Sequence, residues 1–280
     1  MTTEGSPTLL HTLRWAWWSH RRVPYRFSEI WTKGGREEHF RRWNEARAEE
    51  VRRALLGRGL RFPETWSSED LRELREVVVN RAYDVEGFKP SPNGVVVDAG
   101  CGFGDFTLLS ATSHARVFAF DPDPENVRHT KELLEVNGLE ANLNPVALGD
   151  HLGTIRLGKR GPAMLSVSSS REAREVPVWT LDSLKLPRVT LLKIDVEGME
   201  AEVLTGSKSL LRRDRPKVAV EVHGEKPARE VRRILREVDY SLAHSSRSSW
   251  SRDYVFVRNE FWTPSELLSV PRSLRQGEPS

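Results

Sequence analysis

The sequence predicts an α/β protein with a mostly parallel, seven-stranded sheet, an antiparallel strand at one edge, and an N-terminal helical extension. From residue 95 onward, short apolar segments alternate with stretches of helical periodicity, which is typical of a parallel sheet covered on both faces. Before residue 90 only helical periodicity is present, and six of the nine tryptophans fall within the first 66 residues. The expected strands are residues 95–99, 116–121, 144–148, 189–195, 217–223, 240–243 and 253–258.

Helices are expected between several of these strands. The segments with helical periodicity are residues 124–137, 199–212 and 226–238. The last two strands are separated by a short connection, as an antiparallel edge pair requires.

The N-terminal extension is expected to hold two helices. The first has apolar residues at helical spacing over residues 40–55 and stops at Gly57. The second follows Ser67, which is expected to form a capping box with Asp70 three residues later. A turn cluster (PSPNG) then closes the region. The chain thus divides into an extension (1–90), a main domain (91–262) and a tail (263–280) that is expected to be partly disordered.

Composition narrows the classes of function. The 280 residues have a formal net charge of +3, so there is no overall signature of nucleic-acid binding. A single cysteine, Cys101, excludes an internal disulfide and a cysteine-rich zinc site. No apolar run approaches the length of a membrane span, and the N-terminus lacks the features of a secretory signal. A cytoplasmic protein is therefore expected.

A glycine-rich loop follows the first expected strand, in the segment VVVDAGCGFG that starts at Val95. Its three glycines occupy alternate positions before a helix that starts near Asp105, and glycine lets the backbone approach a ligand closely. The dinucleotide fingerprint G-x-G-x-x-G has a different spacing. A carboxylate at the strand end, Asp98, suits a cationic amino-acid group better than a pyrophosphate. The loop therefore favours S-adenosylmethionine over a nicotinamide dinucleotide. The predicted contacts in this segment are Asp98, Gly100, Cys101, Gly102, Phe103 and Gly104.

Two further acidic residues follow the next two strands. Asp121 ends the second strand about 20 residues beyond the loop, where a carboxylate can bind the ribose hydroxyls, and Pro122, which follows it, is also predicted to contact the cofactor. Asp121 can instead serve as the N-cap of the next helix. Asp150 ends the third strand and is predicted at the adenine edge, although Gly149 and Asp150 also suit an ordinary turn.

The segments described above, together with others further along the chain, closely resemble the FkbM family of methyltransferases. The resemblance runs over about residues 78–245 and includes the glycine loop, the segment AFDPDP that ends the second strand, and NPVALGD at residues 144–150. Its most specific part is TLDSL at residues 180–184, followed by LKIDVEGMEAEVLTG at residues 192–206. PKVAVEVH at residues 216–223 completes it.

The resemblance implies a Rossmann-like methyltransferase sheet and methyl transfer from S-adenosylmethionine. The usual acceptor in the family is a hydroxyl of a sugar, a lipid or another small molecule. Members of the family commonly have Glu-Pro where this chain has Asp121 and Pro122, and often have asparagine where it has Phe103. The shorter carboxylate of Asp121 can serve the same ribose contact.

A hydroxyl acceptor must lose a proton, which calls for a general base or a metal ion. Asp195 is predicted at the carboxyl end of the fourth strand, where it can contact the cofactor, hold a metal or orient the acceptor. Glu197 follows in the loop, and His223, at the end of the fifth strand, is the candidate base, with Glu221 on the same face. Whether a divalent metal binds stays open.

Three other groups near these candidates have plainer interpretations. Glu200 falls at a helix N-terminus, where the helix dipole favours a carboxylate in any case. Lys193 is interpreted as structural. Cys101 lies inside the cofactor loop, which argues against a covalent nucleophile.

The segment LLHTLRWAWW with the basic residues after it mixes aromatic and cationic side chains within residues 9–22. It is expected to pack on the main domain and cover its pocket, although peripheral contact with a membrane or stacking on nucleobases are alternatives. An RNA methyltransferase and a non-catalytic module that binds cofactor are the competing functions. The nearly balanced charge of the catalytic half makes nucleic acid the less favoured partner.

Overall fold

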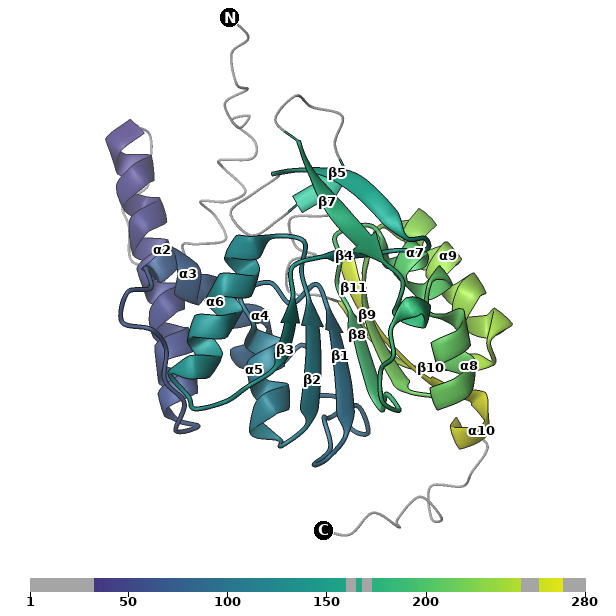
Figure 1. Ribbon diagram of the computed structural model, residues 1–280. Helices are drawn as coiled ribbons and strands as arrows, with labels where there is room; N and C mark the ends of the chain where they lie inside the picture. The colour runs from purple at the N-terminus through teal and green to yellow at the C-terminus, as the bar shows by residue number, and fades with distance from the viewer. Residues whose placement is uncertain (1–32, 160–164, 168–172, 248–256, 269–280) are drawn as a thin grey trace, which may run out of the picture.

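The computed structural model describes residues 33–159, 165–167, 173–247 and 257–268, and its main feature is a seven-stranded sheet (Figure 1). The strand order is β10-β11-β9-β8-β1-β2-β3. All neighbours pair in parallel except β11, which is antiparallel to both β9 and the edge strand β10. The predicted Rossmann-like sheet with its antiparallel edge pair is thus confirmed. The strands are β1 (Val95–Ala99), β2 (Arg116–Phe120), β3 (Asn142–Asn144), β8 (Leu191–Ile194), β9 (Lys217–His223), β10 (Tyr240–Arg247) and β11 (Val257–Pro264).

Helices cover both faces of this sheet (Figure 1). Alternate residues of β1 face opposite ways, so that Val97 joins the core under α7, α8 and α9 while Val96 joins the core under α2 to α6. Every residue of β1 and β8 is therefore buried, which explains their continuous apolar sequence. The helices are α2 (Lys33–Leu56), α3 (Ser68–Glu73), α4 (Arg75–Val78), α5 (Asp105–Thr112), α6 (Pro124–Glu135), α7 (Glu200–Thr205), α8 (Lys208–Asp214), α9 (Glu225–Glu237) and α10 (Ser265–Leu268).

The described part of the N-terminal extension shares its core with the sheet. Val51 and Leu55 of α2 lie in the same apolar cluster as Val96 of β1 and Phe261 of β11. The capping box predicted at Ser67 is present, with the side chain of Ser67 accepting from the backbone N–H of the third helical residue. The Trp/Arg segment within residues 9–22 and most of the C-terminal tail lie outside the described residues.

A second, four-stranded sheet was not predicted. It has the order β4-β7-β5-β6, and Figure 1 shows β5 and β7 beyond the carboxyl ends of β1, β2 and β3. Its small core contains Leu157, Val176 and Val178. The sheet therefore stands over the edge at which ligands bind in α/β proteins. The strands are β4 (Ala147–Leu148), β5 (Gly153–Lys159), β6 (Leu165–Val167) and β7 (Arg174–Trp179).

Two expected elements are divided in the structure. The strand expected at 144–148 is wrong as a single element, because its start pairs with β2 and its end pairs with β7. Pro145, which has no N–H to donate to a ladder, separates the two parts. The helix expected at 199–212 is two helices, which meet at Gly206 and Ser207. At this junction the backbone passes so close to Gly149 that a Cβ on Gly206 would lie 2.0 Å from the carbonyl oxygen of Gly149. That close contact fixes the chain between α7 and α8.

Among the described residues, no helix has both the length and the apolar character needed to cross a membrane.

Candidate functional site

The glycine loop turns back over the ends of β1 and β8. Gly100 has φ +80°, and a Cβ there would lie 1.7 Å from the carbonyl oxygen of Asp195. Gly104, with φ +89°, precedes α5 and packs against Thr130. Gly102 differs, because φ is +51° but a Cβ there would meet nothing within 4 Å. The first and third glycines permit close packing within the protein, and the middle one faces open space.

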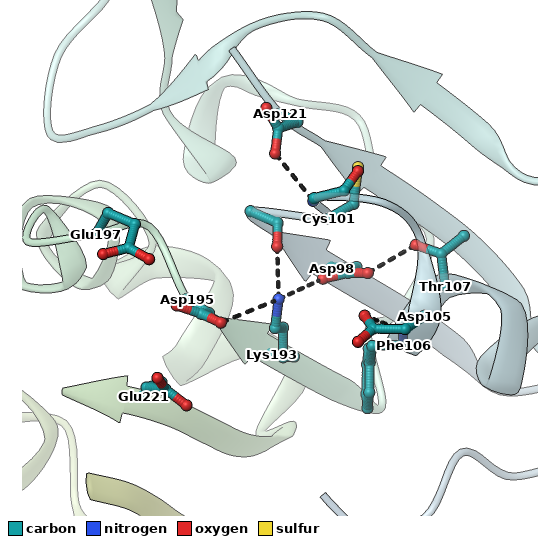
Figure 2. Close-up of polar contacts among 12 residues, drawn as sticks. Asp98, Cys101, Asp105, Phe106, Thr107, Asp121, Lys193, Asp195, Glu197 and Glu221 are labelled. Atoms are coloured by element: carbon teal, nitrogen blue, oxygen red, sulfur yellow. Dashed lines mark hydrogen bonds and ion pairs between the residues drawn. The ribbon is translucent and has the colours of Figure 1, made fainter. Parts of the chain in front are cut away.

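A buried lysine lies beneath the loop. Lys193 of β8 donates to the carbonyl oxygen of Gly100 at 2.5 Å and lies 3.1 Å from Asp98 and 3.9 Å from Asp195 (Figure 2). Asp98 is fully buried and also accepts from Thr107 at 2.6 Å. Burial by itself lowers the pKa of Lys193, but the charges of Asp98 and Asp195 outweigh it and raise that pKa. Asp98 thus supports the loop from below, and its contact with a cofactor stays a prediction.

Asp121 links the end of β2 to the same loop. Its carboxylate accepts from the N–H of Gly102 at 2.9 Å (Figure 2), from the N–H of Asp123 at 2.8 Å and from Asn126 at 3.1 Å. Burial raises the pKa of Asp121 to about 6, although the hydrogen bonds lower it. The alternative interpretation of Asp121 as a helix N-cap is wrong, since Asp123 caps α6 through the N–H of Glu125.

The helical extension contacts the site at two points. Trp66 packs edge-on against Phe103 and His129, and these two rings are stacked with centroids 4.2 Å apart. Tyr83 is buried, with its ring 5.9 Å from the ammonium nitrogen of Lys193. The extension therefore supports the glycine loop from the side of Phe103 and from below. Neither contact was predictable from the sequence, because both join segments that are distant along the chain.

The remaining predicted cofactor residues lie at the same edge. Cys101 is buried, which raises the pKa of its thiol and agrees with its exclusion as a nucleophile. The carbonyl oxygen of Pro122 accepts from Arg174 of β7 at 3.0 Å, so the second sheet reaches the end of β2. Asp150 is exposed in a turn and lies 2.7 Å from a ring nitrogen of His151, and its adenine contact stays a prediction.

The three predicted catalytic residues lie together at the carboxyl ends of β8 and β9. Asp195, Glu197 and His223 each offer a ligand atom, and these atoms lie within 4.8 Å of one another. Glu197 has φ +55°, an uncommon conformation for a residue with a side chain, and Gly198 follows with φ +107°. Asp195 belongs to both halves of the site, because its backbone packs under Gly100 and its carboxylate joins the cluster.

The family model for the methyltransferase FkbM domain matches residues 98–242. The chain belongs to the FkbM methyltransferase family. It is 26% identical over 204 residues to the hexuronic acid methyltransferase AglP of Haloferax volcanii, a match that covers 70% of this chain and 82% of AglP.

In two other similar proteins the match covers a smaller share of their length. The chain is 28% identical over 163 residues to Methyltransferase 1 of Beauveria bassiana, covering 47% of this chain and 65% of that protein. The crystal structure of an FkbM methyltransferase from Methylobacillus flagellatus is similar with a TM-score of 0.48 and 17% identity, covering 79% of this chain and 62% of that one. Each match thus spans less than two thirds of the other protein.

In this FkbM methyltransferase, Glu200 joins the two strand ends. It begins α7, as predicted, but it is fully buried rather than exposed at the helix terminus. One carboxylate oxygen, Oε1, accepts from the N–H of Gly198 at 2.9 Å and lies 3.1 Å from Nδ1 of His223. The sequence could not show this role, because a carboxylate at a helix N-terminus is favoured wherever it points.

Carboxylates surround the other ring nitrogen of His223. Nε2 lies 3.6 Å from Glu197 and 3.5 Å from Glu221. Burial by itself lowers the pKa of His223, but Glu200, Glu221 and the nearby acidic charges outweigh it and raise that pKa to about 11. A base role for His223 requires a neutral imidazole. The role therefore stays a prediction, because another cation would have to replace the proton that these carboxylates favour on His223.

Asp105, the first residue of α5, lies near the Lys193–Asp98 pair (Figure 2), and the sequence indicated it only as a helix start. Burial raises its pKa from 3.8 to about 8, with Asp98 adding to the shift and Lys193 opposing it. Since the folded state holds this proton more tightly than the unfolded state, stability is lost as the pH rises from about 4 to about 8.

The Asp105→Asn variant cannot ionise and should escape that loss. We expect the difference in melting temperature between the variant and the unmodified protein to increase from pH 5 to pH 8 and to stay constant above pH 8.5. Thermal unfolding across this range checks the prediction, since other titrating groups cancel in the difference. A difference that does not vary with pH would show that Asp105 is ionised throughout.

Proposed function

We propose that this protein transfers a methyl group from S-adenosylmethionine to a hydroxyl of a sugar, with acidic sugars as the favoured class. The observation that carries the proposal is the juxtaposition at one sheet edge of the glycine loop and the Asp195–Glu197–His223 cluster. Asp195 contributes to both, so a donor seated on the loop is adjacent to an acceptor seated at the cluster.

The loop fits the proposed cofactor in two respects. Gly102 has free space where a side chain would stand, which suits a ligand in close contact with the backbone. Asp121, with its carboxylate fixed by three donors at the end of β2, is positioned for a ribose. When bound, S-adenosylmethionine supplies a methyl group on a positively charged sulfur.

The chain's own groups then have to orient the acceptor and accept its proton. Methyl transfer is an in-line displacement, so alignment of the acceptor oxygen is a large part of the catalysis. The carboxylates of Asp195 and Glu197 are partly exposed, so they can accept a hydrogen bond from a hydroxyl and take up its proton as the bond from oxygen to the methyl carbon forms and the bond from sulfur breaks. His223 is held by buried Glu200 and can orient the same group. The small sheet lies beyond the carboxyl ends of β1, β2 and β3 (Figure 1).

The choice of a sugar is supported by the match to the hexuronic acid methyltransferase AglP. The acceptor side of the site is acidic, which opposes the phosphate backbone of RNA. A neutral hydroxyl acceptor does not meet this repulsion, and the carboxylate of an acidic sugar would need a divalent cation between it and these side chains.

The test is transfer of labelled methyl from S-adenosylmethionine to a panel of acceptors, with the full chain. The panel contains hexuronic acid oligosaccharides, neutral oligosaccharides, a lipid extract and RNA. We expect label in the sugar fractions, and we expect it to survive alkali, because a methyl ether is stable there whereas a methyl ester on a carboxylate is not. Label confined to RNA, or no transfer together with no calorimetric binding of S-adenosylmethionine, would overturn the proposal.

Cofactor binding should depend strongly on Asp121. Replacing it with alanine removes the acceptor for the N–H of Gly102 and the proposed partner of the ribose. We expect the dissociation constant of S-adenosylmethionine to rise by about 10- to 100-fold, the effect of losing hydrogen bonds to a charged group. Calorimetry measures it, with Glu125→Gln on the exposed start of α6 as the matched control. Equal affinity in the two variants would remove Asp121 from the cofactor site.

A further inference from the structure

We propose that Asp195, Glu197 and His223 form a binding site for a divalent cation. Two carboxylate oxygens and one imidazole nitrogen lie within 4.8 Å of one another. Ligands about 2.0–2.2 Å from a common metal are separated by roughly 3–4 Å, so small rotations of the side chains bring these atoms to bonding distance. Oxygen and imidazole ligands in this proportion suit ions such as Mn²⁺.

The histidine is oriented as a metal ligand. Its Nδ1 lies 3.1 Å from Oε1 of Glu200, a carboxylate with no exposed surface. A proton on Nδ1 donated to that carboxylate leaves the lone pair of Nε2 directed at Glu197 and Glu221. A buried carboxylate that fixes the tautomer in this way is the usual outer partner of a metal-binding histidine.

The charge around the cluster also favours a cation. Glu200 and Glu221 are buried beside the three proposed ligands, so four carboxylates surround one imidazole. Oε2 of Glu200 is buried and has no hydrogen-bond partner among the described residues. Lys193, whose ammonium nitrogen lies 3.9 Å from Asp195, is also held by Asp98 and by the carbonyl oxygen of Gly100. A divalent ion would balance this excess of negative charge.

The site is open on one side. The side chains of Asp195, Glu197 and His223 keep 28%, 31% and 22% of their surface exposed, so an ion can enter from solvent. Three ligands from one side leave coordination positions free for an acceptor. The next step rests on the proposed function. The hydroxyl and carboxylate oxygens of a sugar acid would bind the ion at these free positions, and the ion would increase the acidity of the bound hydroxyl.

The test is a titration of the full chain with Mn²⁺ alone, followed by calorimetry and by electron paramagnetic resonance of the free ion. We expect one site per chain. The Asp195→Asn, Glu197→Gln double variant should lose affinity at least about 100-fold, and Glu200→Gln should lose about 10- to 100-fold through the histidine. Glu202→Gln, on the exposed side of α7, is the matched control and should bind as the unmodified protein does.

Binding of Mn²⁺ that is equal in the double variant and the Glu202→Gln control, or no binding by the unmodified protein, would overturn the proposal. Circular dichroism and thermal unfolding of each variant ensure that a loss of affinity is not a loss of fold. The readout contains no S-adenosylmethionine and no acceptor, so a failure of the methyl-transfer proposal leaves the cation result unchanged. A stimulation of transfer by Mn²⁺ that disappears in Glu200→Gln would connect the two.

Discussion

Replacing Lys193 with methionine is expected to destabilise the fold by about 3–5 kcal/mol, the usual cost of leaving one partner of a buried ion pair without the other. Lys193 is 3% exposed and Asp98 is fully buried, so no solvent replaces the lost charge. The variant also loses the hydrogen bond to the carbonyl oxygen of Gly100, which holds the glycine loop proposed to bind the cofactor. We therefore expect weaker binding of S-adenosylmethionine in addition to the loss of stability.

Urea unfolding measures the change, and two further variants identify its cause. Lys185→Met, an exposed lysine before β8, should change stability by less than about 0.5 kcal/mol. Asp98→Asn in the Lys193→Met background should restore part of the loss, because the charge left without a partner is then removed. A Lys193→Met variant as stable as Lys185→Met would mean that the buried pair contributes nothing.

The Lys193–Asp98 pair also shows where sequence-based prediction stops. The strands β1 and β8 were predicted from their apolar runs, because both faces of each are buried. Asp98 and Lys193 are direct neighbours in the β1–β8 register, about one hundred residues apart in the chain. Their pairing depends on which strands are adjacent, and the period of the hydrophobic pattern carries no such information.

The second sheet was missed for a different reason. Its strands bury only one face, as the alternating burial of Val176 and Val178 in β7 shows. The period of two was therefore present in the sequence, but it extended over only a few residues among charged and glycine-containing segments. The contact of Arg174 with Pro122 could not be anticipated without that sheet.

The candidate site was more accessible to prediction, because the carboxyl ends of adjacent parallel strands meet at one edge. That rule placed Asp195 and His223 together, and the structure brings them within reach of Glu197. The inward direction of Glu200 was not predictable. It depends on the turn at Glu197 and Gly198, whose positive φ angles place α7 against the end of β9.

Alanine substitutions at two glycines of the loop separate an effect on stability from an effect on cofactor binding. In Gly100→Ala, the new Cβ meets the backbone of Asp195, and the residue keeps a positive φ angle that costs a side-chain residue about 1–2 kcal/mol. Overpacking adds about 1–3 kcal/mol, so we expect a loss of about 2–5 kcal/mol and no measurable cofactor binding. Urea unfolding and calorimetry measure the two effects.

Gly102→Ala is the matched variant two residues away. Its φ is also positive, but its Cβ meets nothing within 4 Å, so stability should fall by only about 1–2 kcal/mol. The added methyl group stands in the space that the cofactor is proposed to fill, and affinity for S-adenosylmethionine should fall by about 10-fold or more, the equivalent of roughly 1.4 kcal/mol. A folded Gly102→Ala variant that binds S-adenosylmethionine as tightly as the unmodified protein would show that the cofactor does not bind at this loop. A variant that unfolds as readily as Gly100→Ala would show instead that the space is filled by the protein.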